Sequence, residues 1–316
     1  MKPISRPVRR GLILFFLTVA LASILHLALW AMQSYQSGKV QDGLEQLYHQ
    51  GGLTIGQSDP NQEVQEEAST EGAEDNAGGT STEDANAGTS FEPVMLPEYR
   101  KLYEINSDIV GWLNIGDGLL STPVMQRDRD NEYYLTHDFY GEEDKHGQVF
   151  LDKGNSPQLT DDNTILYGHN ITSDRSMFNI LTRYKDTEFA AEHPVIQLNT
   201  LYNRYQYAVA AVYIVSTRPE HGELFDYISY LKFSTRDAKQ AYIAQIQKRS
   251  LIDTGVKMTA DDRLLTLSTC TYEFADARLV VVARQLREGE SAEDFGKQVV
   301  KRENPVMPQI WNELFG

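Results

Sequence analysis

The chain has 316 residues, a formal net charge of −16 and a single cysteine, Cys270. One cysteine excludes an intramolecular disulfide and a cysteine-rich metal site. Much of the acidity falls between residues 40 and 99, which contain no Lys or Arg, and the remainder has no basic stripe of the kind that binds phosphate backbones. The sequence therefore predicts no nucleic-acid partner, no metal and no other cofactor.

The N-terminus has the pattern of a membrane anchor. Residues 1–10 form a basic segment, and residues 11–32 are apolar without formal charge, long enough to cross the ~30 Å hydrocarbon core as a helix. By the positive-inside rule the basic segment stays in the cytoplasm, so the rest of the chain is predicted to be extracellular, held at the cell membrane by one span. The alternative is a cleaved signal peptide, but the apolar run is long for one and shows no clear small-residue cleavage site before Trp30.

The next segment, residues 33–92, is predicted to be an acidic disordered linker. From about residue 51 it is rich in Gly, Ser, Thr, Asn, Asp and Glu and has few side chains that could form a core. Its like charges would repel, extend it and lift the folded domain away from the membrane. A single folded domain is expected over residues 93–287, and residues 288–316 form a C-terminal extension to which no role is assigned.

The folded part reads as mainly β. About eight segments combine β-branched and aromatic residues with turn-formers between them. These segments are 108–115, 121–126, 147–152, 163–170, 194–199, 204–216, 263–272 and 277–285. Short helices are expected at 94–105, 176–186 and 235–249. Because the regular alternation of strand and helix is missing, a barrel or sandwich is favoured over a doubly wound sheet.

The surroundings of Cys270 suggest chemistry. In an extended strand, Thr266, Ser268 and Cys270 share one face, while Leu265 and Leu267 share the other. A lone cysteine is more often a small residue that fills a gap in the core. An unpaired thiol on a polar face of an exported protein favours a functional role instead.

Two further residues could assist the thiol. A hairpin after Cys270 would bring Arg278 alongside it, where a guanidinium could favour the thiolate or hold an oxyanion, although a surface arginine is the simpler reading of Arg278 alone. A cysteine nucleophile also needs an acid and base. Of the seven histidines, His169 closes an apolar strand where it meets a loop, a common position for functional groups, but spacing does not choose among them rigorously.

Taken together, these motifs resemble the sortases. TLSTC at residues 266–270, the following Arg278 and YGHN at residues 167–170 are similar to the sortase signature, and the segments between Leu102 and Arg284 resemble its class B branch. The resemblance implies an eight-stranded sortase-type β-barrel with short helices. It also implies a long helix between the sixth and seventh strands, which residues 235–249 fit.

The resemblance also implies roles for individual residues. Cys270 would be the nucleophile, His169 the general acid and base, and Arg278 the stabiliser of substrate and oxyanion. The substrate groove would be lined by Asn131, Leu135, Tyr167 and Ser268. Core packing remains the alternative for Leu135 and Tyr167, and a turn role remains the alternative for Asn131.

The implied reaction is cysteine transpeptidation. The thiolate would attack the Thr carbonyl of a C-terminal sorting signal, near Asn-Pro-x-Thr, on secreted proteins, and a peptidoglycan amine would resolve the acyl-enzyme. Two alternatives stay open: a cysteine peptidase that uses water as the acceptor, and a non-catalytic tethered binding domain.

Overall fold

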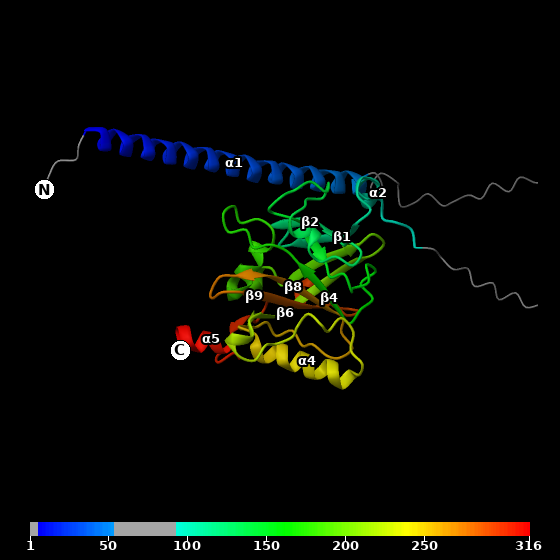
Figure 1. Ribbon diagram of the computed structural model, residues 1–316. Coiled ribbons are helices and arrows are strands. Elements are labelled where there is room, and N and C mark those ends of the chain that lie inside the picture. Colours follow the sequence, from blue (N-terminus) through cyan, green and yellow to red (C-terminus); the bar gives the residue numbers. More distant parts are fainter. Residues whose placement is uncertain (1–5, 54–92) are drawn as a thin grey trace, which may run out of the picture.

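The protein is described by a computed structural model that covers residues 6–53 and 93–316. Within this part, eight strands close into a barrel in the order β1-β2-β3-β4-β8-β9-β6-β5, with helices around it (Figure 1). The mainly β barrel predicted from the sequence is therefore confirmed, and each predicted strand overlaps one strand of the barrel.

The barrel strands are β1 (Ile109–Ile115), β2 (Leu120–Met125), β3 (Val149–Leu151), β4 (Asn163–Tyr167), β5 (Val195–Thr200), β6 (Arg204–Ser216), β8 (Leu264–Thr271) and β9 (Ala277–Gln285). A short pair, β7 (Ile252–Asp253) and β10 (Val300–Lys301), lies apart from the barrel sheet. The α-helices are α1 (Arg6–Leu53), α2 (Pro97–Ile105), α3 (Thr187–Glu192), α4 (Arg236–Arg249) and α5 (Gln309–Phe315). Short 3₁₀ helices are η1 (Tyr133–Leu135), η2 (Phe178–Lys185), η3 (Pro219–His221) and η4 (Ala292–Asp294).

The two faces of β8 meet different partners. Leu265 and Leu267 belong to the large apolar cluster, together with Leu166 of β4 and Val281 of β9. Leu264, on the opposite face, belongs to a second cluster that α4 covers. Since side chains alternate along a strand, Thr266, Ser268 and Cys270 lie on this outer face, away from the barrel interior.

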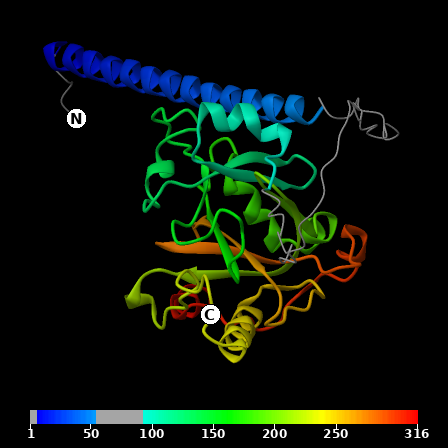
Figure 2. The same cartoon turned by 90° about the vertical axis from the view of Figure 1, so that its right-hand side faces the viewer.

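Helix α4 covers that outer face below the barrel, opposite to α1 in both views (Figures 1 and 2). Thr235 caps its N-terminus by accepting a hydrogen bond from the backbone N–H of Ala238. Tyr242, Ile243 and Ile246 are buried along one side of the helix because their spacing places them on a single face. The predicted helix at 235–249 is confirmed.

Helix α1 corrects the predicted start of the linker at residue 33. The helix continues to Leu53, and its second half packs on the barrel through Val40, Leu44, Leu47 and Tyr48. These residues recur at helical spacing and form an apolar stripe. The apolar first half lies clear of the barrel and is long enough to cross a membrane by length and composition (Figure 1).

The predicted lifting role of the linker is also corrected. The C-terminal end of α1 touches α2, since a Cβ on Gly51 would come within 2.5 Å of the Cα of Glu98. The two helices that flank residues 54–92 therefore belong to the same folded body, and residues 54–92 themselves lie outside the described residues. The apolar half of α1 is joined to its docked half by continuous helix, so the linker does not lie between that half and the contact of α1 with the barrel. Residues 1–5 of the basic segment also lie outside the described part.

The C-terminal extension is part of the folded domain. Val300 and Lys301 of β10 pair with β7. Met307, Ile310 and Trp311 pack against the large apolar cluster. Residue 287 is therefore not the end of the folded unit.

Candidate active site

The hairpin predicted after Cys270 forms from β8 and β9. Cys270 and Arg278 are direct partners in the antiparallel register. Its turn ends at Asp276, whose φ of 56° is left-handed and whose backbone oxygen accepts a hydrogen bond from the N–H of Thr217, 3.2 Å away. Asp276 also forms an ion pair with Arg218. The turn is thus tied to the end of β6, and the thiol and the guanidinium stand on neighbouring strands.

His169 reaches the same place from β4. This strand runs parallel to β8, with Tyr167 beside Ser268, so a continuation by two residues brings His169 level with Cys270. The chain is held there by the Thr269 hydroxyl, which donates to the Gly168 carbonyl at 2.7 Å, and by the Asn170 amide, which donates to the Cys270 carbonyl at 2.9 Å. All three predicted catalytic residues therefore lie at one end of three adjacent strands.

The ring of His169 is oriented by a backbone carbonyl. Its Nε2 lies 2.8 Å from the carbonyl oxygen of Leu135, and the ring is half-buried. A carbonyl oxygen can only accept, so the neutral imidazole carries its proton on Nε2 and leaves Nδ1 as an acceptor. Leu135 thus contributes its backbone to the site, while its half-buried side chain packs against a core cluster.

Ser268 is turned toward a residue that sequence reasoning missed. Its hydroxyl lies 2.7 Å from the hydroxyl of Tyr227, and its residue is 4% exposed. Burial raises the pKa of Tyr227, so this phenol stays protonated and can donate. Tyr227 stands in the irregular connection between β6 and α4, where no periodicity marks a buried residue.

Asn131 and Tyr167 meet at one carboxylate beside the site. The Asn131 amide donates to Asp152 Oδ2 at 2.8 Å, and the Tyr167 hydroxyl donates to the same oxygen at 2.9 Å. The Asn131 side-chain oxygen also accepts from the backbone N–H of Lys153 at 2.7 Å. Burial, reinforced by the charge of Asp152, raises the pKa of Tyr167. Both side chains thus hold the loops in place.

Next to the thiol, an open hollow is lined by Cys270, Tyr272, Phe274 and Arg278. Tyr272 is 66% exposed and its hydroxyl donates to the Asn170 carbonyl at 3.0 Å. Tyr272 is the second residue at the site that sequence reasoning missed, because an exposed loop tyrosine carries no local signal.

Comparison with known proteins identifies the family. A model described as the sortase domain matches residues 120–286, more than half of the chain. The chain belongs to the sortase family. The sortase is 35% identical over 209 residues to Sortase B of Listeria monocytogenes, which covers 66% of this chain and 81% of that protein. It is 34% identical over 195 residues to Sortase B of Staphylococcus aureus, covering 60% and 75%.

Solved structures agree with the class B assignment. A Staphylococcus aureus sortase B-substrate complex superposes with a TM-score of 0.63 at 26% identity, covering 82% of this chain and 100% of that chain. A sortase B from Bacillus anthracis in complex with AAEK1 gives a TM-score of 0.60 at 28% identity, covering 81% and 99%. The sortase is thus a class B enzyme, a cysteine transpeptidase of the kind that anchors surface proteins.

Proposed function

We propose that this sortase cleaves a C-terminal sorting signal resembling Asn-Pro-x-Thr after its Thr and joins the acyl product to a peptidoglycan amine. In this proposal Cys270 is the nucleophile, His169 the general acid and base, and Arg278 the stabiliser of substrate and oxyanion. The proposal is supported above all by the pairing of Cys270 with Arg278 across the hairpin, beside the end of β4 that carries His169.

The chemistry follows from these positions. The Cys270 thiolate attacks the Thr carbonyl carbon, and the resulting oxyanion is balanced by the fixed charge of Arg278. The carbon–nitrogen bond breaks as protonated His169 gives its proton to the leaving amine, which leaves a thioester on Cys270. The incoming amine then loses a proton to His169 and forms the new amide bond, and the thiolate departs.

The ring orientation of His169 suits both proton transfers. Because Nε2 is engaged by the Leu135 carbonyl, Nδ1 is the nitrogen that exchanges the proton with the amines. An imidazolium can donate this proton in the first half-reaction, and the neutral imidazole can accept one in the second.

The groove for the sorting signal is proposed to be bordered by Asn131, Leu135, Tyr167 and Ser268. Ser268 supports this because it precedes Cys270 by two residues on the same strand face. The substrate complex of the Staphylococcus aureus enzyme shows that a relative of this fold takes a substrate. Since Asn131 and Tyr167 already bind Asp152, they would act mainly by holding the groove wall.

The proposed location is the outer side of the cell membrane. The apolar half of α1 would cross the bilayer once, with the basic N-terminus in the cytoplasm and the barrel outside. Secreted proteins that carry the signal and the amines of the cell wall would then meet the site on the same side. The membrane itself is a partner through α1.

The test uses the full chain in detergent micelles with internally quenched fluorescent peptides that carry candidate sorting signals. Intact-mass analysis detects the acyl-enzyme, and product analysis with and without an added amine separates transpeptidation from hydrolysis. Cys270→Ala should abolish the acyl-enzyme, and His169→Ala should reduce its rate by about 10²-fold or more. His49→Ala, at a histidine with a 62% exposed side chain on α1, is the matched control and should leave the rate unchanged. Acyl-enzyme formation by Cys270→Ala would favour the non-catalytic reading of this thiol.

A further inference from the structure

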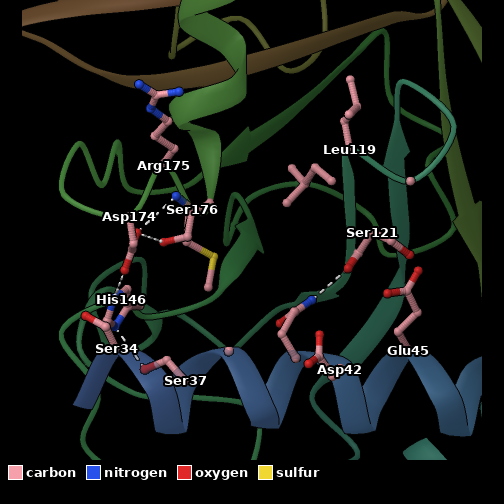
Figure 3. A pocket seen from close by; sticks show the side chains of 15 residues that line it. Ser34, Ser37, Asp42, Glu45, Leu119, Ser121, His146, Asp174, Arg175 and Ser176 are labelled. Carbon is pink, nitrogen blue, oxygen red and sulfur yellow. Dashed lines mark hydrogen bonds and ion pairs between the residues drawn. The ribbon is translucent and has the colours of Figure 1, made fainter. Parts of the chain in front are cut away.

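A second histidine lies buried where α1 meets the barrel. His146 is 2% exposed, and each ring nitrogen faces a carboxylate. Its Nδ1 lies 2.7 Å from Asp144, and its Nε2 lies 2.8 Å from Asp174, a contact drawn in Figure 3. The hydroxyl of Ser37, on α1, lies 2.9 Å from Nδ1 and also bonds the Asp144 carboxylate. Three segments that are distant in the sequence therefore meet at one imidazole.

The charge state of His146 follows from these partners. Two carboxylates accept from opposite sides of the ring, an arrangement that only the doubly protonated imidazolium can satisfy. The hydrogen bond to Asp144, followed by that to Asp174, raises the pKa of His146 despite its burial. The His146 ring is thus positively charged and joins two carboxylates, rather than filling space in an apolar core.

Asp174 stands in the loop that follows His169. The loop, residues 170–177, is closed at its base by the paired residues Asn170 and Met177, and the N–H of Phe178 donates to the His169 carbonyl at 2.8 Å. The position of this loop is therefore linked directly to the backbone of His169.

The loop cannot hold its shape by backbone preference alone. Arg175 and Met177 have φ of 62° and 53°, a left-handed region that non-glycine residues rarely adopt. One carboxyl oxygen of Asp174 accepts from the N–H and the hydroxyl of Ser176, at 3.1 and 2.6 Å, and shapes the turn. Its other oxygen binds His146, as Figure 3 shows, so the strained loop is fastened from outside through Asp174.

The segment that holds His146 also holds the ring of His169. Asp144 and His146 belong to residues 133–148, and the same segment supplies the Leu135 carbonyl that binds His169 Nε2. A backbone hydrogen bond from the N–H of Asp144 to the Thr136 carbonyl, at 2.9 Å, holds the two ends of this segment together. Two contacts thus join the same pair of segments, one at each histidine.

We propose that His146 is a positioning residue for His169: by fastening Asp174 to residues 133–148, it keeps the ring of His169 against the Leu135 carbonyl. Ser37 makes the docking of α1 part of the same network. The inference rests on the proposed role of His169 as general acid and base. It deepens that role by naming what sets the geometry of the ring.

The test measures acylation by the full chain in detergent micelles. His146→Gln and Asp174→Asn should each lower kcat for acylation by about 10-fold or more and leave KM within about two-fold, since substrate contacts are untouched. Ser37→Ala should lower kcat in the same direction by a smaller factor, and an unchanged kcat would remove α1 from the network. His137→Gln is the matched control and should leave kcat unchanged. This histidine is in the same segment, but its Nδ1 bonds the Tyr133 carbonyl within that segment and does not join it to Asp174.

A merely structural role would not change the protonation of His169. With ¹⁵N labelling, His146→Gln should shift the Nε2 resonance of His169 and the pH profile of acylation, whereas His137→Gln should shift neither. Should His146→Gln fail to fold, the isosteric Asp174→Asn decides the same question. If His169→Ala kept full activity, the proposed function itself would fail. Loss of activity in His169→Ala, with kcat, pH profile and resonance unchanged in His146→Gln and Asp174→Asn, would overturn only the positioning role.

Discussion

Replacing Leu44 by Ala should destabilise the protein strongly, although Leu44 lies far outside the matched sortase region. Its side chain is 0% exposed and packs in one cluster with Tyr99, Leu102 and Trp112. Loss of a buried leucine typically costs about 2–5 kcal/mol, depending on how far the site collapses. One turn further along α1, Tyr48 is stacked on Trp112 with ring centroids 4.2 Å apart, which limits collapse. We therefore expect a loss of about 3 kcal/mol.

The measurement is urea unfolding of the full chain in detergent micelles, followed by circular dichroism. A loss of that size should also lower Tm by roughly 6–12 °C for a domain of this length. Leu314→Ala is the matched control, because Leu314 is 53% exposed on α5, and its cost should stay below about 1 kcal/mol. If Leu44→Ala cost no more than this control, the second half of α1 would not be docked on the barrel.

Four further outcomes are expected. Arg278→Lys should lower the acylation rate by about 10²-fold, measured by rapid-quench mass spectrometry, because a point charge replaces the planar guanidinium. Tyr227→Phe should cost about 1 kcal/mol in urea unfolding, since it leaves the buried Ser268 hydroxyl without its hydrogen-bond partner, and an unchanged midpoint would contradict that bond. The pKa of His146 is raised above 6.5 by its two carboxylates, so its stabilisation should be complete below about pH 6.5 and disappear as the pH rises through the raised value. The free energy of unfolding, measured across this pH range, should decline in the native chain and not in His146→Gln. Deleting residues 60–90 should leave cleavage of soluble peptides within about two-fold, because the flanking helices α1 and α2 pack against each other without it, and an inactive product would refute this.

Local sequence patterns predicted most of the strands of the fold, and they predicted the pairing of Cys270 with Arg278 but not the position of His169. The hairpin between Cys270 and Arg278 was predictable because its two strands are adjacent in the sequence and a short turn fixes their register. His169 was harder to assign, since β4 and β8 are separated by α4 and several strands, and nothing local encodes a parallel pairing over that distance. The resemblance to sortases supplied that choice.

Other features were missed for identifiable physical reasons. The linker was predicted to begin at residue 33, too early in the chain, because the acidic composition beyond residue 51 was extended to the residues before it. Val40, Leu44 and Leu47 already showed helical spacing. The strands β7 and β10 are two residues long, too short for any alternation to be visible. The network around His146 had no signal in the sequence, because its second carboxylate partner, Asp174, is brought to it only by tertiary structure.

The place of the last hairpin in the barrel governs when the enzyme can first act. Strands β1 to β6 can pair among themselves as an open sheet, with β4 and β6 at its edges, and the β8–β9 hairpin fills the gap between those edges. The hairpin also carries the thiol and the guanidinium. A nascent chain that has emerged only as far as α4 therefore has neither a closed barrel nor a reactive sulfur. Closure of the sheet and completion of the proposed catalytic group therefore depend on the same hairpin, so the thiol joins the chain only with the strands that close the barrel.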